Sequence, residues 1–316
     1  YEVFLQSFVL YFVVIDPFGT TPIFMSLTKN QNAKEKVKSA FEGVLTATII
    51  LIFFSIVGNF ILSYLNISLG AFKIAGGIIL VNTFPGASAR LDGNDILVSD
   101  QGIFILGFQR DPNPIQVLEI IHENQLKDKI TLNVTKRTYN IQRINGIQKE
   151  KVDPPKSFLD RIYLERKSVK ESRNKAILIE ELFYNNGFNV PATGPISGVY
   201  GSQRILNGKA KSPHYGIDIA LPEGDRVFAP MDGIVLFTHN DLYFSGGTII
   251  IGHGQGLTTS YLHLSEISVK NSDVVKRGDL IGKVGSTGRA TGPHLHWGVE
   301  LNGKRLDPQY LKVFKK

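Results

Sequence analysis

A run of 22 residues without a charged side chain, residues 44–65, limits the fold more than any other feature of the chain. At about 1.5 Å of rise per residue, a helix of this length crosses the roughly 30 Å hydrocarbon core of a membrane. Residues 3–27 are also long enough, but Asp16 and Pro17 interrupt their apolar character. An ionisable residue beside a proline is costly in lipid, so we expect that backbone to break against protein or a polar cavity. The sequence therefore predicts two transmembrane helices.

The charges around these two runs predict their orientation. Residues 28–39 carry four lysines against one glutamate. Because positively charged loops stay in the cytoplasm, we expect this loop to be cytoplasmic and the chain to leave the second helix on the outer face. A third apolar patch, residues 71–81, contains Lys73 and is too short to span. The expected location is therefore the inner membrane, in contact with its lipid, with everything after this patch in the periplasm.

The same region resembles a known membrane family. The stretch FVVIDPFGTTPIFMSLT (residues 12–28) and the segment GAFKIAGGIILV (residues 70–81) are similar to the start of a MarC-type multi-pass membrane protein. The likeness covers roughly residues 1–80 and stops inside what would be the third helix of that family. We interpret the chain as a fusion joined near residues 77–85, with residues 1–82 as the membrane segment. The lack of an initiating Met predicts a trimmed or fragmentary start.

The middle of the chain changes from apolar runs to alternation. Turn signals such as Asp92-Gly93 and Asn145-Gly146 separate short segments rich in β-branched and aromatic residues. That pattern predicts a small antiparallel β module over residues 83–150. After it, residues 156–184 are dense in Lys, Arg and Glu, with apolar residues at helical spacing. We expect a solvated helix that packs by one stripe, so residues 151–188 are predicted to be a charged helical linker that acts as a spacer between modules.

Composition excludes several kinds of chemistry. The chain has no cysteine, so disulfides, cysteine-ligated metals and thiol catalysis are excluded. Its 35 basic and 28 acidic residues give a net charge of +7, spread along the chain. This charge suits an anionic cell surface. Nucleic acid is not a predicted partner, because no binding motif is present and acidic residues are interleaved with the basic ones.

Six of the seven histidines lie in the last third of the chain, residues 189–316. Turn signals there separate short strand-like segments, such as GIVLF, GTIIIGH and LHWGVEL, and predict an all-β domain with little helix. In KSPHYGIDIA, an extended backbone places His214, Gly216 and Asp218 on one face. An imidazole and a carboxylate would then converge over a residue without a side chain, which leaves room for an ion.

Two further histidine patterns follow in the same domain. In TGPHLHWGVE, the strand period places His294 and His296 on one face and Leu295 on the other. Two imidazoles side by side repel when protonated, so this pair favours a functional role. In SYLHLS, His263 lies between two leucines that we expect to face the core. A lone strand histidine is more often structural, and we assign His239 and His253 to that role. Three such patterns within residues 214–296 favour a site.

These three patterns together resemble the signature of the lysostaphin/LytM-type zinc endopeptidases of peptidoglycan. The elements that carry the resemblance are His214-x-x-x-Asp218, residues 261–263 (YLH) and residues 285–296 (GSTGRATGPHLH). The likeness covers about residues 196–308, and the preceding β module and helical arm resemble the leader of periplasmic proteobacterial members. Carried over by position, the resemblance implies one Zn²⁺ held by His214, Asp218 and His296. His263 and His294 would be the two unliganded catalytic histidines.

The implied site agrees with the chemistry of catalytic zinc. Such sites have three protein ligands and an open position for water, whose pKa falls toward about 7. One histidine beside that water can move its proton, and a second can hydrogen-bond the developing oxyanion. We expect His294 to be nearer the base role, although the sequence leaves the division between it and His263 open. Predicted substrate contacts are Gly292, Tyr261 and Arg204; Arg204 fits an anion contact and an ordinary surface arginine equally well.

The function predicted from the sequence is therefore a membrane-anchored periplasmic zinc metalloendopeptidase that hydrolyses peptide cross-links of peptidoglycan. The bond cleaved stays open between D-Ala–diaminopimelate, a glycine bridge and another linkage. One alternative is a metal-free LytM-like regulator or peptidoglycan-binding module. Another is a membrane transporter fragment carried by residues 1–80. A third likeness, of residues 274–286 to a turn in biotinyl or lipoyl carrier domains, is interpreted as shared β architecture.

Overall fold

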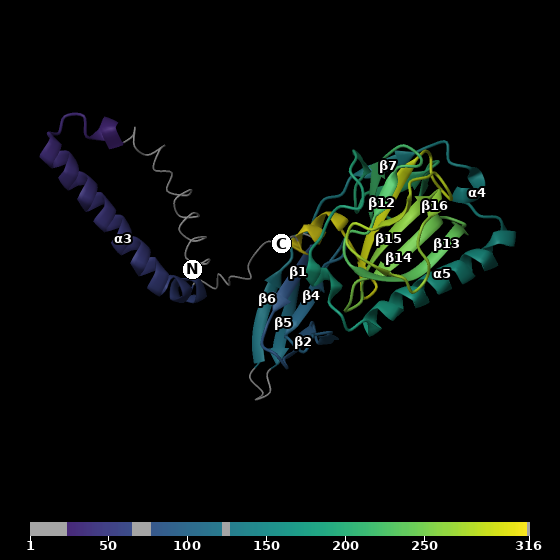
Figure 1. Ribbon diagram of the computed structural model, residues 1–316, viewed down its shortest axis with the longest axis horizontal. Helices are drawn as coiled ribbons and strands as arrows, with labels where there is room; N and C mark the ends of the chain where they lie inside the picture. Colours follow the sequence, from purple (N-terminus) through teal and green to yellow (C-terminus); the bar gives the residue numbers. More distant parts are fainter. Residues whose placement is uncertain (1–23, 65–76, 122–126, 315–316) are drawn as a thin grey trace. The chain divides into compact units, whose positions relative to one another are not determined.

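The computed structural model describes residues 24–64, 77–121 and 127–314 (Figure 1). The chain divides into two compact units, Tyr1–Leu69 and Gly70–Lys316. The predicted segment 3–27 lies almost wholly outside the described residues. The β module, the linker and the C-terminal domain of the sequence analysis all lie within the second unit.

The first unit contains one long helix, α3 (Ala33–Tyr64). Its start is fixed by a reciprocal cap, in which the Glu35 backbone N–H donates to the Asn32 side chain and the Asn32 N–H donates to the Glu35 carboxylate. This cap converts the second half of the loop predicted over residues 28–39 into the first turns of the helix. Among the described residues, no helix combines the length and the apolarity required to cross a membrane. The predicted transmembrane helices are therefore not confirmed.

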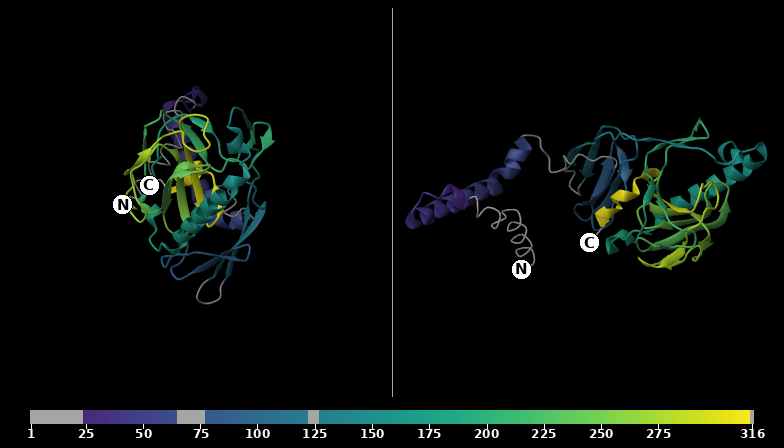
Figure 2. Two further views of the ribbon diagram at one scale, coloured as in Figure 1. Left: turned by 90° about the vertical axis from the view of Figure 1, so that its right-hand side faces the viewer. Right: turned by 90° about the horizontal axis from the view of Figure 1, so that it is seen from above.

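The second unit begins with a small β module. One sheet has the order β3 (Asn94–Ile96), β2 (Ser88–Leu91), β5 (Ile115–Ile121) and β6 (Lys127–Asn133), all antiparallel. The predicted Asp92-Gly93 turn joins β2 to β3, with positive φ at both residues. A separate pair, β1 (Ile78–Asn82) and β4 (Ile103–Gly107), packs with it around buried Phe104, Leu106 and Leu118. Figure 2 shows these blue strands beside the green and yellow strands of the larger sheet.

Two strands of this region lie where the sequence analysis did not place them. Strand β1 begins at Ile78, inside the predicted membrane segment 1–82, because the apolar residues IILVN pair in register with IFILG of β4. Strand β7 (Ile141–Ile144), predicted within the β module, instead pairs in parallel with β9 (Gln203–Leu206). β9 also pairs with β10 (Lys209–Ala210). The boundary predicted at residue 150 therefore cuts through a sheet that both parts build.

The larger sheet of the C-terminal part carries the core. Its order is β17 (Val274–Val275), β13 (Gly233–Leu242), β14 (Gly246–Gly252), β15 (Leu257–Leu264), β19 (His294–Leu301), β11 (Ile217–Ala220) and β8 (Ile196–Gly198), with β20 (Lys304–Leu306) beside β19. A three-stranded sheet joins β12 (Arg226–Phe228), β18 (Leu280–Lys283) and β16 (Glu266–Ile267). The segments predicted as strands form β13, β14, β15, β18 and β19. The predicted all-β character of this domain is confirmed.

The predicted linker is not a spacer. It forms α4 (Lys149–Val152), the turn η1 (Lys156–Phe158), α5 (Leu159–Asn174) and the turns η2 (Lys175–Leu178) and η3 (Phe183–Asn186). Helix α5 lies along β13 and β14 (Figure 1). Its Glu165 accepts a hydrogen bond from the Tyr243 N–H at 2.8 Å, and its Arg173 pairs with Glu300 of β19 at 2.7 Å. Helix α5 is therefore part of the C-terminal domain. The chain ends in the turn η4 (Pro308–Phe314).

The helix is also shorter than the predicted range of residues 156–184. After Asn174 the backbone groups bond to the β14–β15 turn instead of continuing the helix. The Gly256 N–H donates to the Ala176 carbonyl at 3.1 Å, and the Phe183 N–H donates to the His253 carbonyl at 3.1 Å. A periodicity argument does not detect this, because the competing partners lie about 80 residues away in sequence.

His253 has a structural position beneath the sheet. Its side chain is 0% exposed; Nδ1–H donates to the Asp232 carbonyl at 2.7 Å, and Nε2 accepts from the Thr259 hydroxyl at 2.7 Å. Burial lowers the pKa of His253 to about 4, against 6.5 for an ordinary histidine. The unfolded chain therefore binds a proton here more readily than the folded chain does. This group's contribution to stability is present above pH 6.5 and is lost as the pH falls toward 4.

We expect His253→Gln to flatten the acid side of the stability profile. A pKa difference of this size corresponds to about 3 kcal/mol lost between pH 6.5 and pH 4. Urea unfolding of the full chain at several pH values measures it, with fluorescence of the single tryptophan, the buried Trp297, as the reporter. His239→Gln, which replaces an exposed imidazole, is the matched control. Equal acid slopes for wild type and His253→Gln would contradict the assignment.

Candidate metal centre

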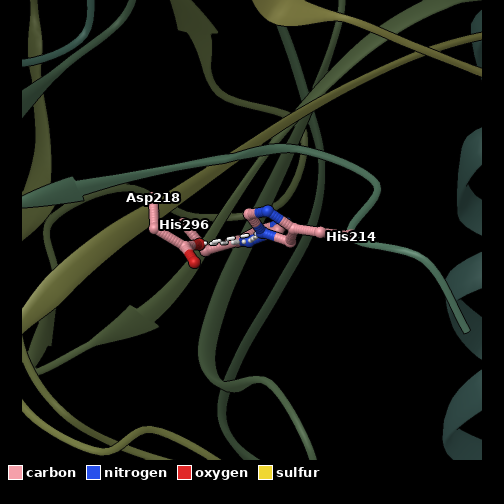
Figure 3. Close-up of side chains that lie close together, drawn as sticks. All are labelled: His214, Asp218 and His296. Atoms are coloured by element: carbon pink, nitrogen blue, oxygen red, sulfur yellow. Dashed lines mark hydrogen bonds and ion pairs between the residues drawn. The ribbon is translucent and has the colours of Figure 1, made fainter. Parts of the chain in front are cut away.

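Two neighbouring strands place the first two candidate ligands side by side. Asp218 on β11 is paired directly with His296 on β19, and Ala220 is paired with His294. Directly paired residues of an antiparallel pair project to the same face, a few ångström apart. Leu295 and Trp297 project to the opposite face and are buried in the core, as the alternation predicted. The third residue, His214, lies just before β11 and turns its ring toward the pair (Figure 3).

Three donor atoms converge at this point. His214 Nε2 lies 3.0 Å from Asp218 Oδ1 and 2.9 Å from His296 Nδ1, and His296 Nδ1 lies 2.8 Å from the same carboxylate oxygen. Ligands at 2.0–2.2 Å from a tetrahedral zinc ion are about 3.3 Å apart, so a small outward shift of each side chain accommodates the ion. Two imidazole nitrogens and one carboxylate oxygen are the donor set of a catalytic zinc site. These residues therefore fit a metal ion.

Surrounding groups hold these donors in a state suited to binding a cation. The His214 Nδ1–H donates to the Val199 carbonyl at 3.1 Å, which directs the Nε2 lone pair toward Asp218. Arg204 pairs with the other carboxylate oxygen, Oδ2. Burial opposes ionisation of Asp218, but its interactions with the adjacent His214 and His296 outweigh burial and lower its pKa. Burial lowers the pKa of His296 to about 4, so its imidazole is neutral near pH 7.

A glycine between the ligands is required by space. A Cβ atom at Gly216 would lie 2.6 Å from His296 Nε2 and 2.6 Å from the Trp297 carbonyl oxygen. Any side chain there would push the His296 ring out of position. Gly216 therefore makes room for His296, a residue outside the His214–Asp218 segment for which the sequence predicted such space.

Two further histidines stand beside these ligands. The ring centroids of His263 and His294 are 4.8 Å apart, and those of His263 and His296 are 6.2 Å apart. His263 Nδ1–H donates to the Thr287 carbonyl at 2.8 Å, and His294 Nδ1–H donates to the Gly292 carbonyl at 2.9 Å. In a neutral imidazole this leaves each Nε2 with a free lone pair. Each Nε2 can therefore accept a hydrogen bond.

A β-bulge positions His263. Between Ile249–Tyr261 and Gly247–Leu264, β15 has one more residue than β14, and His263 within this bulge has φ of 65°. A bulge redirects side chains that strict alternation would send to the other face. As a result Leu262, predicted to face the core, lines the cleft together with His263, while Leu264 is buried. Burial, followed by the like charges of His294 and His296, lowers the pKa of His263 to about 3.

The ligands open onto a cleft of about 870 Å³. His214, His263 and His296 line it from the sheet, α5 forms one wall, and Arg204 also faces it. Gly292 is half-buried in the glycine-rich loop, residues 285–292, where its carbonyl orients His294. Tyr261 is 0% exposed and its hydroxyl bonds Thr259, so the predicted contact of its side chain with substrate is wrong. Strict alternation places Tyr261 on the same face as His263. The bulge that separates their faces lies after Tyr261, and the sequence of this strand does not reveal it.

Several cleft residues were not singled out from the sequence. Tyr215 is 37% exposed beside His214, and Phe244 and Arg289 lie at one end of the cleft. Arg289 stands inside the glycine-rich loop and Tyr215 inside KSPHYGIDIA, so their proximity to the motifs was a usable signal. Arg166 comes from α5, and nothing in its local sequence distinguishes it from the other charged residues there.

Two parts of the chain match known protein families. Residues 212–308 match Peptidase family M23, and residues 1–84 match the MarC family of integral membrane proteins. The chain therefore carries an M23 (LytM/lysostaphin-type) peptidase domain at its C-terminal end and a MarC-family segment at its N-terminal end. Both resemblances stated from the motifs are confirmed.

Individual relatives match the C-terminal end. The chain is 46% identical over 99 residues to the peptidoglycan DD-endopeptidase ShyA of Vibrio cholerae, covering 31% of this chain and 23% of ShyA. It is 43% identical over 95 residues to the DD-carboxypeptidase/endopeptidase Mpg of Neisseria meningitidis, covering 30% of this chain and 22% of Mpg. The chain thus spans less than a quarter of either relative.

A solved structure matches a longer part of the chain. A crystal structure from Pseudomonas aeruginosa, assigned to peptidase M23, is 29% identical with a TM-score of 0.57. The match covers 77% of this chain and 96% of that one. This coverage is larger than the family match over residues 212–308.

Proposed function

We propose that the protein is a zinc-dependent endopeptidase that hydrolyses peptide cross-links of peptidoglycan. The observation that carries the proposal is the convergence of His214, Asp218 and His296 donor atoms within 3.0 Å, beside two histidines whose Nε2 atoms are free. A metal-free regulator has no need of this complete set. The names of the relatives ShyA and Mpg support peptidoglycan as the substrate and favour a D,D-linkage as the bond cleaved.

The two histidines beside the metal ligands have different roles, and His294 carries out both proton transfers. Zinc in such a site supplies Lewis acidity that lowers the pKa of water toward about 7. His294 Nε2, 3.8 Å from Asp218 Oδ1, accepts the proton of the attacking water, because the nearby carboxylate stabilises the imidazolium that forms. The same nitrogen then delivers the proton to the leaving amine. His263, whose pKa is lowered by burial, stays neutral beside it and orients the reacting groups.

The location follows from the N-terminal segment. Its match to an integral membrane family and the lysine-rich residues 28–39 support an inner-membrane tether with the peptidase domain in the periplasm. The murein layer lies on that side of the membrane. The net charge of +7 favours approach to its anionic peptides.

Digestion of purified sacculi by the full chain tests the activity. We expect new peptide ends in the muropeptide profile, their loss on treatment with a chelator, and their return when zinc is restored. Cleavage that persists in full after metal removal would reject the zinc mechanism. An absence of new ends at any zinc concentration would favour the regulatory alternative.

A further inference from the structure

The lining of the cleft has more positive charge than its own carboxylates neutralise. Seven basic and two acidic residues line the cleft. The two acidic residues already have partners: Glu165 accepts from Arg161 and from the Tyr243 N–H, and Glu300 pairs with Arg173 and Arg305. The cleft therefore has cationic groups available for an anionic ligand.

Two of these cations share one aromatic ring. The guanidinium carbons of Arg289 and Arg166 lie 4.7 and 5.8 Å from the centre of the Phe244 ring. Within the described parts of the chain, no carboxylate pairs with either guanidinium. Their positions are held by stacking on Phe244 and, for Arg289, by a hydrogen bond of 3.4 Å to the Lys151 carbonyl. Both keep donor groups free, since a guanidinium has five.

The backbone fixes the Arg289 end of this pair. The Arg289 N–H donates to the Phe244 carbonyl at 2.8 Å. Gly288, with φ of 72°, brings the two segments this close, because a Cβ there would lie 2.6 Å from the same carbonyl oxygen. The glycine-rich loop is thus seated on the β13–β14 turn. Arg289 is positioned by the fold and does not move freely like a surface side chain.

Arg289 lies near a third arginine, Arg204, which contacts the metal centre. Burial, and then the neighbouring charges of Arg204 and Arg166, lower the pKa of Arg289. Arg204 is neutralised by Asp218, whereas Arg166 and Arg289 are not. Arg166 is exposed and Arg289 is half-buried. Like charges held this close together are stabilised by a bound anion. The planar fork of arginine matches a carboxylate in particular.

We propose that Arg166 and Arg289, stacked on Phe244, form a subsite that binds a free carboxylate of the substrate peptide. The subsite rests on the proposed function, since it selects among peptides that enter the same cleft. Arg289 comes from the M23 domain, but Arg166 comes from α5, outside residues 212–308. The helix that precedes the family domain therefore completes substrate recognition.

Peptide binding tests the subsite without requiring hydrolysis. The probe is a synthetic cross-linked stem peptide in three forms: with free carboxylates, with the C-terminal carboxylate amidated, and with the side-chain carboxylates amidated. Calorimetry with the chelated full chain measures the affinity of each form. We expect one of the two amidations to weaken binding about tenfold, and that form identifies which carboxylate is bound.

Matched variants locate the effect. Arg166→Gln and Arg289→Gln should each weaken binding of the free-carboxylate peptide about tenfold and leave binding of the sensitive amidated form unchanged. Arg289→Lys keeps the charge without the fork, and Arg226→Gln removes an exposed arginine outside the cleft as a control. Binding that is equal for all three peptides would overturn the subsite, as would equal losses for free and amidated forms.

The kinetics separate this proposal from the proposed function. With the zinc-loaded chain, we expect Arg166→Gln to raise KM about tenfold at nearly constant kcat, and only for the free-carboxylate peptide. Equal hydrolysis of the amidated and free-carboxylate peptides would reject the subsite and would still support the endopeptidase function. Carboxylate-dependent binding without hydrolysis would support the subsite and reject the endopeptidase.

Discussion

Replacing His296 by alanine is expected to abolish cleavage of sacculi. His296 supplies one of three donor atoms that lie within 3.0 Å of one another, so its loss leaves two ligands for the ion. The rate should fall by roughly 10³-fold or more, because the lowered water pKa that the metal provides is lost with it. Zinc bound per chain, measured by elemental analysis after dialysis, should fall from one toward zero.

A control separates this loss from general damage. His239→Ala replaces an exposed histidine that does not line the cleft and should keep both zinc and activity. Unfolding of His296→Ala at neutral pH, followed by Trp297 fluorescence, checks that the sheet is intact. Retained cleavage by a correctly folded, zinc-free His296→Ala protein would exclude the metal mechanism.

Replacing His294 by alanine is the second large effect, with a different signature. Its Nδ1–H is held by the Gly292 carbonyl and its Nε2 lies 3.8 Å from Asp218 Oδ1, so it stands beside the metal ligands without belonging to them. We expect kcat to fall by about 10²–10⁴-fold, the usual contribution of a general acid–base group. Zinc content should stay at one ion per chain, in contrast to His296→Ala.

His263→Ala provides the comparison for this assignment. If His294 transfers the proton, its loss should lower kcat more than the loss of His263, which only orients the reacting groups. The reverse result would exchange the roles of the two histidines. Loss of zinc from His294→Ala would show instead that this residue helps to hold the ion.

The local patterns of the sequence predicted much of the C-terminal domain. Strands β13 to β15 and β19 were visible as alternating segments between turn signals, and the shared face of His294 and His296 followed from the strand period. These features depend on neighbours in sequence, so local reasoning reaches them.

The features that the sequence does not predict depend on contacts between segments that are distant in sequence. The bulge that turns His263 into the cleft is a mismatch between two strands, and alternation along one strand contains no record of it. Tyr261 was misplaced for the same reason. The charges that dominate the composition of α5 favour a solvated spacer, although Glu165 and Arg173 bond to residues about 80 to 130 positions away. The pairing of Arg204 with Asp218 was likewise invisible.

The packing of α5 on the sheet has a consequence for the design of shorter fragments of this chain. Val169 of α5 packs against Phe237, Leu242 and Ile250, which are otherwise part of the open flank of the sheet. A fragment that begins at residue 190 would retain every proposed zinc ligand but would expose these three apolar side chains to water. We expect such a fragment to self-associate, so a stable form of the peptidase domain should include α5.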